Sequence, residues 1–109
     1  MEFANKVISV IEDMNTNRKH YRLLEQAKSA VTSISLNIAE GKGRFSKKEF
    51  VQFLYIARGS LYEVVTLAII FHERGWITDE TLSSLKEDGS HIGKMLTSLA
   101  KSIKTSINH

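Results

Sequence analysis

The fold is decided by a stretch in which one helical pattern ends and another begins, and it reads Ser33-Ile34-Ser35-Leu36-Asn37-Ile38-Ala39-Glu40-Gly41-Lys42-Gly43-Arg44-Phe45-Ser46-Lys47-Lys48-Glu49-Phe50. Upstream of its glycines, apolar residues recur every three or four positions, at Leu24, Ala27, Val31, Ile34 and Ile38. Gly41 and Gly43 interrupt this period, and glycine permits the positive φ angle with which many helices end. We therefore expect the helix to end at these glycines.

The residues that follow carry the signals of a helix start. Ser46 with Glu49 three positions later forms a capping box, and Phe45 and Phe50 occupy the two positions of a hydrophobic staple. The sequence therefore predicts that the next helix begins at Lys47 and that a short loop joins it to the helix before.

The rest of the chain keeps the helical period. It contains no Pro, and its β-branched residues fall at helical rather than alternating spacings. We expect a short or kinked first helix from about residue 3, with an interruption at residues 15–17, and a third helix unbroken as far as Gly75. A fourth helix should begin near Asp79, with a kink or a weak turn at Gly89 and Gly93. Short connections favour antiparallel neighbours, so the sequence predicts an all-α, antiparallel up-down-up-down four-helix bundle in one domain, residues 1–109.

Small polar groups break the apolar pattern of the two central helices. Five of them share one helical face of the first, at Gln26, Ser29, Ser33, Asn37 and Glu40. Gly59, Ser60 and Glu63 share a face of the second. We interpret six of these residues as a buried, hydrogen-bonded seam at a close helix crossing: Ser33, Asn37, Glu40, Gly59, Ser60 and Glu63. A ligand site is the alternative, which the absence of a converging His or Cys disfavours.

The third helix is apolar on more than one face. One stripe contains Phe50, Leu54, Leu61 and Phe71, and Ile56, Leu67 and Ile70 flank the polar residues on another. A helix that is apolar on several sides is buried on several sides, so we expect the extra face to contact a second copy of the protein. In the alternative reading, the helix simply lies centrally and leaves Val51, Tyr55 and Tyr62 exposed.

The excess positive charge is concentrated in one part of the chain. The formal net charge is +3, and residues 51–109 are balanced. The excess gathers around the loop and the first turn of the third helix, where a helix start also favours anions; we name as candidate phosphate contacts Lys42, Arg44, Lys47 and Lys48. A second basic group follows the last acidic residue, at Lys94, Lys101 and Lys104. A solvated helical face is the alternative for both groups.

Composition argues against several other functions. The chain has no Cys, which removes disulfides, thiolate nucleophiles and sulfur-ligated zinc. Its four His do not fall at the Glu-x-x-His spacing of di-iron bundles, and neither Gly-rich phosphate-loop motif is complete. We therefore expect no catalytic residues, no metal and no cofactor. The longest uninterrupted apolar run, Leu67 to Phe71, is far shorter than a membrane span, so we expect a cytoplasmic protein.

Several motifs in fixed order resemble the four-helix-bundle proteins encoded within 23S rRNA intervening sequences: Asn37-Ile38-Ala39-Glu40-Gly41, Gly43-Arg44-x-Ser46, Lys48-Glu49-Phe50 and Gly59-Ser60-x-x-Glu63. The resemblance implies an all-helical protomer in a ring-shaped homo-oligomer, commonly five-fold. It also implies a fold similar to the accessory protein of diversity-generating retroelements, which binds nucleic acid and a reverse transcriptase. The chain departs from the family pattern at Ser35, where many relatives have Pro, and at Lys28-Ser29, where an Arg pair is common.

The expected function is thus that of a non-enzymatic, oligomeric binding module. We expect a homopentamer that acts as an accessory protein for RNA or DNA, with a reverse transcriptase as a candidate protein partner and no membrane association. The alternative is a structural or protein-interaction scaffold that binds no nucleic acid, in which the basic residues serve solubility.

Overall fold

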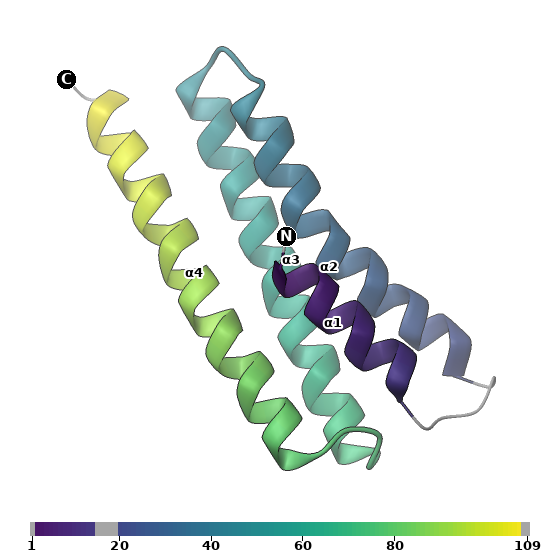
Figure 1. The fold of residues 1–109 in the computed structure, drawn as a ribbon. Coiled ribbons are helices and arrows are strands. Elements are labelled where there is room, and N and C mark those ends of the chain that lie inside the picture. Colours follow the sequence, from purple (N-terminus) through teal and green to yellow (C-terminus); the bar gives the residue numbers. More distant parts are fainter. Residues whose placement is uncertain (1, 15–19, 108–109) are drawn as a thin grey trace.

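The computed structural model describes residues 2–14 and 20–107, which form four helices and no strand. They are α1 (Glu2–Asp13), α2 (Tyr21–Lys42), α3 (Lys47–Glu73) and α4 (Asp79–Ile107). Successive helices run in opposite directions and form a bundle 53 Å long and 22 by 18 Å across (Figure 1). The all-α four-helix bundle is therefore confirmed. The interruption expected at residues 15–17 lies outside the described residues.

The start of α3 is where the capping signal places it. Ser46 has an extended backbone, and its side chain accepts a hydrogen bond from the Glu49 N–H at 3.3 Å. The expected hydrophobic staple is wrong, because Phe45 is fully exposed. Phe50 packs instead beside Gly41 of α2.

The end of α2 differs from the expectation. Gly43 has φ −79°, so no positive φ ends this helix, and its N–H donates to the carbonyl oxygens of Ala39 and Glu40. Among the described residues the positive φ belongs to Gly75, at 78°, just after α3. Gly41 is needed for packing rather than for a turn: a Cβ atom there would lie 2.8 Å from Phe50 Cδ1 and 2.8 Å from Phe53 Cβ.

The glycines of α4 do not kink it either. The helix continues from Asp79 to Ile107 through both of them (Figure 1). Gly89 is buried against α3, where an added Cβ atom would lie 2.9 Å from Val65 Cγ2, and one at Gly93 would lie 3.5 Å from Leu61 Cδ2. The glycines therefore let α3 and α4 approach closely, which explains why they occur inside a helix despite their low helix propensity.

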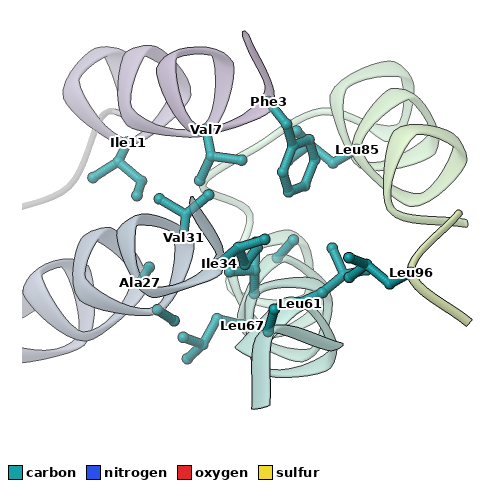
Figure 2. Packing of buried hydrophobic residues seen from close by; sticks show 14 of the residues in the cluster. Phe3, Val7, Ile11, Ala27, Val31, Ile34, Leu61, Leu67, Leu85 and Leu96 are labelled. Carbon is teal, nitrogen blue, oxygen red and sulfur yellow. The ribbon is translucent and has the colours of Figure 1, made fainter. Parts of the chain in front are cut away.

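The core is built around α3, which packs against α2 on one side and α4 on the other. Its most enclosed side chains are Val31 and Ile34 of α2 with Leu54 and Leu61 of α3. Figure 2 shows Val31, Ile34 and Leu61 among the buried residues. Burying one such side chain contributes about 1.5–3 kcal/mol. By length and composition α3 could cross a membrane. Eight of its residues are buried, however, as expected for the central helix of a bundle.

Helix α1 covers only part of the bundle. With 12 residues it is less than half as long as α4, which has 29. Phe3, Val7 and Ile11 are buried against the other helices (Figure 2). On the α4 side, Lys6 Nζ donates to Ser84 Oγ and lies 2.5 Å from Asp88 Oδ2. The half of the bundle that contains the α2–α3 loop is therefore built from three helices.

Candidate nucleic-acid interface

The four predicted phosphate contacts, Lys42, Arg44, Lys47 and Lys48, do not form one cluster. Arg44 differs from the three lysines because carboxylates of the protein neutralise its charge. Its Nη2 atom lies 2.6 Å from Glu40 Oε1, and its Nε atom lies 4.0 Å from Glu49 Oε2. Its guanidinium also lies over the Phe53 ring, 5.1 Å from the centroid. Two carboxylates and a ring thus hold Arg44 on the α2 side, where a phosphate would have to compete with them.

The lysines at the start of α3 have a different environment. Lys47 Nζ donates to Ser106 Oγ at 2.6 Å, which joins the first turn of α3 to the last turn of α4. Lys48 lines a groove with Lys104 of α4. Lys42 is exposed. The antiparallel arrangement therefore joins the two basic groups of the sequence, because the α4 lysines that follow the last acidic residue end beside the start of α3.

The groove that Lys48 enters has a volume of about 480 Å³ and lies between α3 and α4. Its lining is completed by Val51, Gln52, Tyr55, Lys104 and Ile107. Lys104 Nζ and the Arg58 guanidinium carbon each lie 4.8 Å from the centroid of the Tyr55 ring. Arg58 also donates from Nη1 to Thr97 Oγ1 at 3.1 Å, so α4 holds its guanidinium in place.

The same side of the α3–α4 contact holds a second hollow, of about 390 Å³. It is lined by Tyr62 of α3 and by Gly89, Ser90, Gly93, Lys94, Thr97 and Ser98 of α4. Thr97 of this second hollow accepts the hydrogen bond from Arg58, and the Arg58 guanidinium lies over the Tyr55 ring of the first hollow. These contacts link the two hollows. We call the combined feature the α3–α4 groove, and its cations are Lys48, Arg58, Lys94 and Lys104.

Sequence reasoning missed Tyr55 and Arg58 as parts of this surface. The missing signal is the combination of two spacings: Lys48, Tyr55 and Tyr62 recur every seven residues and so share one face of α3. Only the pairing of α3 with α4 brings Lys104 to that face.

The polar seam between α2 and α3 is present as a set of hydrogen bonds. Ser33 Oγ and Ser60 Oγ are 2.9 Å apart, and Asn37 Nδ2 donates to the carbonyl oxygen of Ser33 at 2.8 Å and to its Oγ at 2.9 Å. Further along, Gln26 Nε2 donates to Glu63 Oε1 at 3.5 Å. The Ser33–Ser60 and Gln26–Glu63 bonds connect α2 to α3 along one edge of their contact, whereas the bonds of Asn37 lie within α2.

The expectation that the whole seam is buried is wrong. Ser33, Asn37 and Ser60 are half-buried, whereas Glu40, Gly59 and Glu63 are exposed. No polar side chain of the described part of the chain is fully buried. Glu40 pairs with Arg44 instead of joining the seam, and a Cβ atom at Gly59 would meet nothing within 4 Å. The carboxylates keep their contact with solvent because burial of an ionised group is costly.

Within residues 2–14 and 20–107, no three His, Asp or Glu side chains gather in the way that a metal site requires. His72 Nε2 lies 2.5 Å from Oδ1 of Asp79, the first residue of α4, at the α3–α4 turn. For binding a ligand, the described residues offer the cations and tyrosine rings between α3 and α4.

Comparison with known proteins places this geometry in a family. No curated protein matches the chain. A crystal structure of a protein of unknown function from the S23 ribosomal protein family of Bacteroides thetaiotaomicron is similar, with 27% sequence identity and a TM-score of 0.84 over 92% of this chain and 93% of that one. The sequence model of the 23S rRNA-intervening sequence proteins matches residues 1–98. The chain therefore belongs to the 23S rRNA-intervening sequence protein family.

Proposed function

We propose that the protein is a non-enzymatic, oligomeric binding module that associates with nucleic acid through the basic end of its bundle. The observation that carries the proposal is the Lys47–Ser106 hydrogen bond, which joins the start of α3 to the acid-free end of α4. Lys47 and Lys48 at the start of α3 therefore lie at the same end of the bundle as Lys104 of α4. Phosphate groups bind such surfaces through charge neutralisation and counterion release.

Assembly of several copies is the second part of the proposal. Leu36 of α2 is 63% exposed and Ile56 of α3 is 50% exposed. Gly59 lies one turn beyond Ile56 with open space around it, so the backbone of another helix could approach closely. We expect these residues to contact a second copy. The family resemblance favours a closed ring of five, which would repeat the basic surface around the ring.

Salt-dependent binding tests the nucleic-acid proposal. Fluorescence anisotropy with labelled RNA and DNA should show binding at low salt that weakens as salt increases. A variant with Gln at residues 42, 44, 47 and 48 should bind more weakly, with a salt slope flatter by about 0.7–0.9 for each lost phosphate contact. We expect Arg44 to contribute least because two carboxylates already face it.

The matched control is Lys86→Gln, which removes one charge from the exposed surface at the other end of α4. It should leave binding almost unchanged. If the quadruple variant folds and binds as tightly as the parent, the start of α3 is not the interface. If the parent binds no nucleic acid even at low salt, the proposal fails as a whole.

A scaffold without nucleic-acid binding is the alternative, and the ion pairs of Arg44 favour it, because they give this basic residue a structural role. Light scattering separates assembly from binding: an oligomer that does not bind RNA or DNA supports the scaffold, and a monomer at micromolar concentration contradicts both the binding module and the scaffold.

By resemblance, a reverse transcriptase is the protein partner to test, in pull-down with the purified oligomer. We propose a cytoplasmic location because α3 is enclosed by the bundle.

A further inference from the structure

We propose that the α3–α4 groove is a binding track for single-stranded nucleic acid, in which tyrosine rings stack on bases and cations contact phosphates. The rings are Tyr55 and Tyr62, and the cations are Lys48, Arg58, Lys94 and Lys104. This inference rests on the proposed function, since it names the strand type and the surface. It moves the main contacts from the α2–α3 loop to the opposite side of α3.

The first argument is unpaired charge. None of the four cations forms an ion pair with any carboxylate of the described residues, although Lys6, Lys28 and Arg44 all do. Two acidic residues of α3 have other partners, since Glu49 lies near Arg44 and Glu63 accepts a hydrogen bond from Gln26. Like charges held on one groove repel one another, and an anionic strand would remove that repulsion.

The second argument is the position of the aromatic rings. Tyr55 and Tyr62 are about two turns apart on the same face of α3, which corresponds to roughly 10 Å along the helix. Tyr62 is 57% exposed and Tyr55 is half-buried at the mouth of the groove. Aromatic rings along a positively charged groove are the arrangement with which proteins bind single strands without sequence preference.

The contacts already present on Tyr55 are compatible with a stacked base. Lys104 lies over its ring, but Lys104 is an exposed, flexible side chain. An exposed cation–π contact is weaker than the stacking of a base on an aromatic ring. A base can therefore displace the Lys104 ammonium, which then remains close enough to contact the adjoining phosphate. Arg58 stays in place because Thr97 holds its guanidinium.

The rings also explain the choice of a single strand over a duplex. In a duplex the faces of the bases are covered by neighbouring bases, so a tyrosine on a helix surface cannot stack on them. A duplex would contact only the cations of the groove. The preference for single strands should consequently depend on the tyrosines, whereas the salt dependence should depend on the lysines.

Anisotropy with labelled oligothymidylate, oligouridylate and a blunt DNA duplex tests this division. Tyr62→Leu should weaken single-strand binding about ten-fold and leave duplex binding unchanged, while Tyr62→Phe, which keeps the ring, should bind like the parent. Lys104→Gln should weaken binding of both forms and flatten the single-strand salt slope by about 0.7. Lys86→Gln, about five turns away on the same side of α4, is the matched control and should change neither.

Chemical protection gives a second measurement that needs no variant. Acetylation of the parent, followed by mass spectrometry, should show that oligothymidylate protects Lys48, Lys94 and Lys104 but not Lys86. It avoids the risk that a change at the half-buried Tyr55 disturbs folding. Circular dichroism melting of each variant checks that altered binding does not reflect unfolding.

The outcomes separate this inference from the proposed function. If the parent binds nucleic acid but Tyr62→Leu and Lys104→Gln bind as the parent does, the groove is not the site and the proposed function survives. Tighter binding of duplex than of single strands, with no effect of Tyr62→Leu, would also overturn the track. If the parent binds nothing at low salt, both proposals fall together.

Discussion

The two contacts that α3 makes along its length differ in how their polar groups are satisfied. On the α2 side, Ser33 bonds to Ser60 and Arg44 pairs with Glu40, so polar groups find partners within the protein. On the α4 side, Lys48 and Lys104 face a groove and pair with no described carboxylate. The polar groups named on the α2 side thus have partners within the protein, whereas these two lysines on the α4 side have no carboxylate partner among the described residues and remain available to a ligand.

The same contrast appears in the glycines. Gly41 fits so closely against Phe50 and Phe53 that no Cβ atom could be added without movement. Gly89 also lies close to α3, but an added Cβ atom there would come within 3 Å of only one atom, Val65 Cγ2. Gly59 meets nothing within the protomer. Substitutions at these positions, and at the core between them, separate tight contacts from open ones.

The largest effect should come from Leu61→Ala. Leu61 is 1% exposed and sits on the α4 side of α3, where it lies close to Gly89 and Gly93. Removing its side chain should lower the free energy of unfolding by about 2–5 kcal/mol, because a cavity is left in the core. Urea unfolding followed by circular dichroism measures the change. A loss below about 1 kcal/mol would show that α4 collapses into the space, and hence that the α3–α4 contact is loose.

Gly41→Ala should cost less but still destabilise the protein. The added methyl group would overlap Phe50 and Phe53, and such overpacking typically costs about 1–3 kcal/mol. The matched change Gly89→Ala should cost less, since its added methyl group would overlap Val65 alone and the better helix propensity of Ala offsets part of that cost. Equal losses of stability for both variants would mean that the two contacts of α3 are equally rigid.

Ser33→Ala should have a moderate effect. It removes the hydrogen bonds to Ser60 and Asn37 from a half-buried position, at a cost of about 1 kcal/mol. Glu63→Ala is the matched change at an exposed member of the seam, where the hydrogen bond to Gln26 is long, so its effect should stay within about 0.5 kcal/mol. A larger cost for Glu63→Ala than for Ser33→Ala in thermal melting would indicate that assembly buries the carboxylate.

Gly59→Ala should produce a small change of opposite sign. Because nothing lies near its added methyl group, the protomer should gain roughly 0.5–1 kcal/mol from helix propensity and a less flexible unfolded chain. The variant also tests the proposed contact between copies. If another helix approaches Gly59 closely, light scattering should show weakened assembly, whereas an unchanged oligomer places the interface elsewhere.

The sequence predicted those features that depend on neighbouring residues. The capping box at Ser46 located the start of α3 because its partner, Glu49, is three residues away. The two glycines marked the end of α2 correctly but for a wrong reason: Gly41 responds to Phe50 and Phe53 across the helix pair, not to its own backbone. The predicted staple between Phe45 and Phe50 is wrong for the same reason, because Phe50 packs against Gly41 of the neighbouring helix.

The candidate site was harder to predict because its residues are distant in the chain. Lys48 and Lys104 lie near opposite ends of the α3-to-α4 segment and meet only through antiparallel packing. Arg44 was named for its charge, but its neutralisation by Glu40 and Glu49 depends on side-chain geometry that composition does not reveal. The total charge of residues 51–109 is balanced, so it does not reveal that the basic residues of the groove lack an acidic partner.

The shortness of α1 also has a consequence for how the protein opens. Stability is distributed unevenly when one element makes fewer buried contacts than the rest. α1 contributes Phe3, Val7 and Ile11 to the core, whereas α3 contributes eight buried residues. Detachment of α1 would break the Lys6–Asp88 pair and uncover Val31, which lies beside Val7 and Ile11 (Figure 2). We therefore expect α1 to open before the rest of the bundle, so that its amides exchange with solvent at a lower free energy than those of α3.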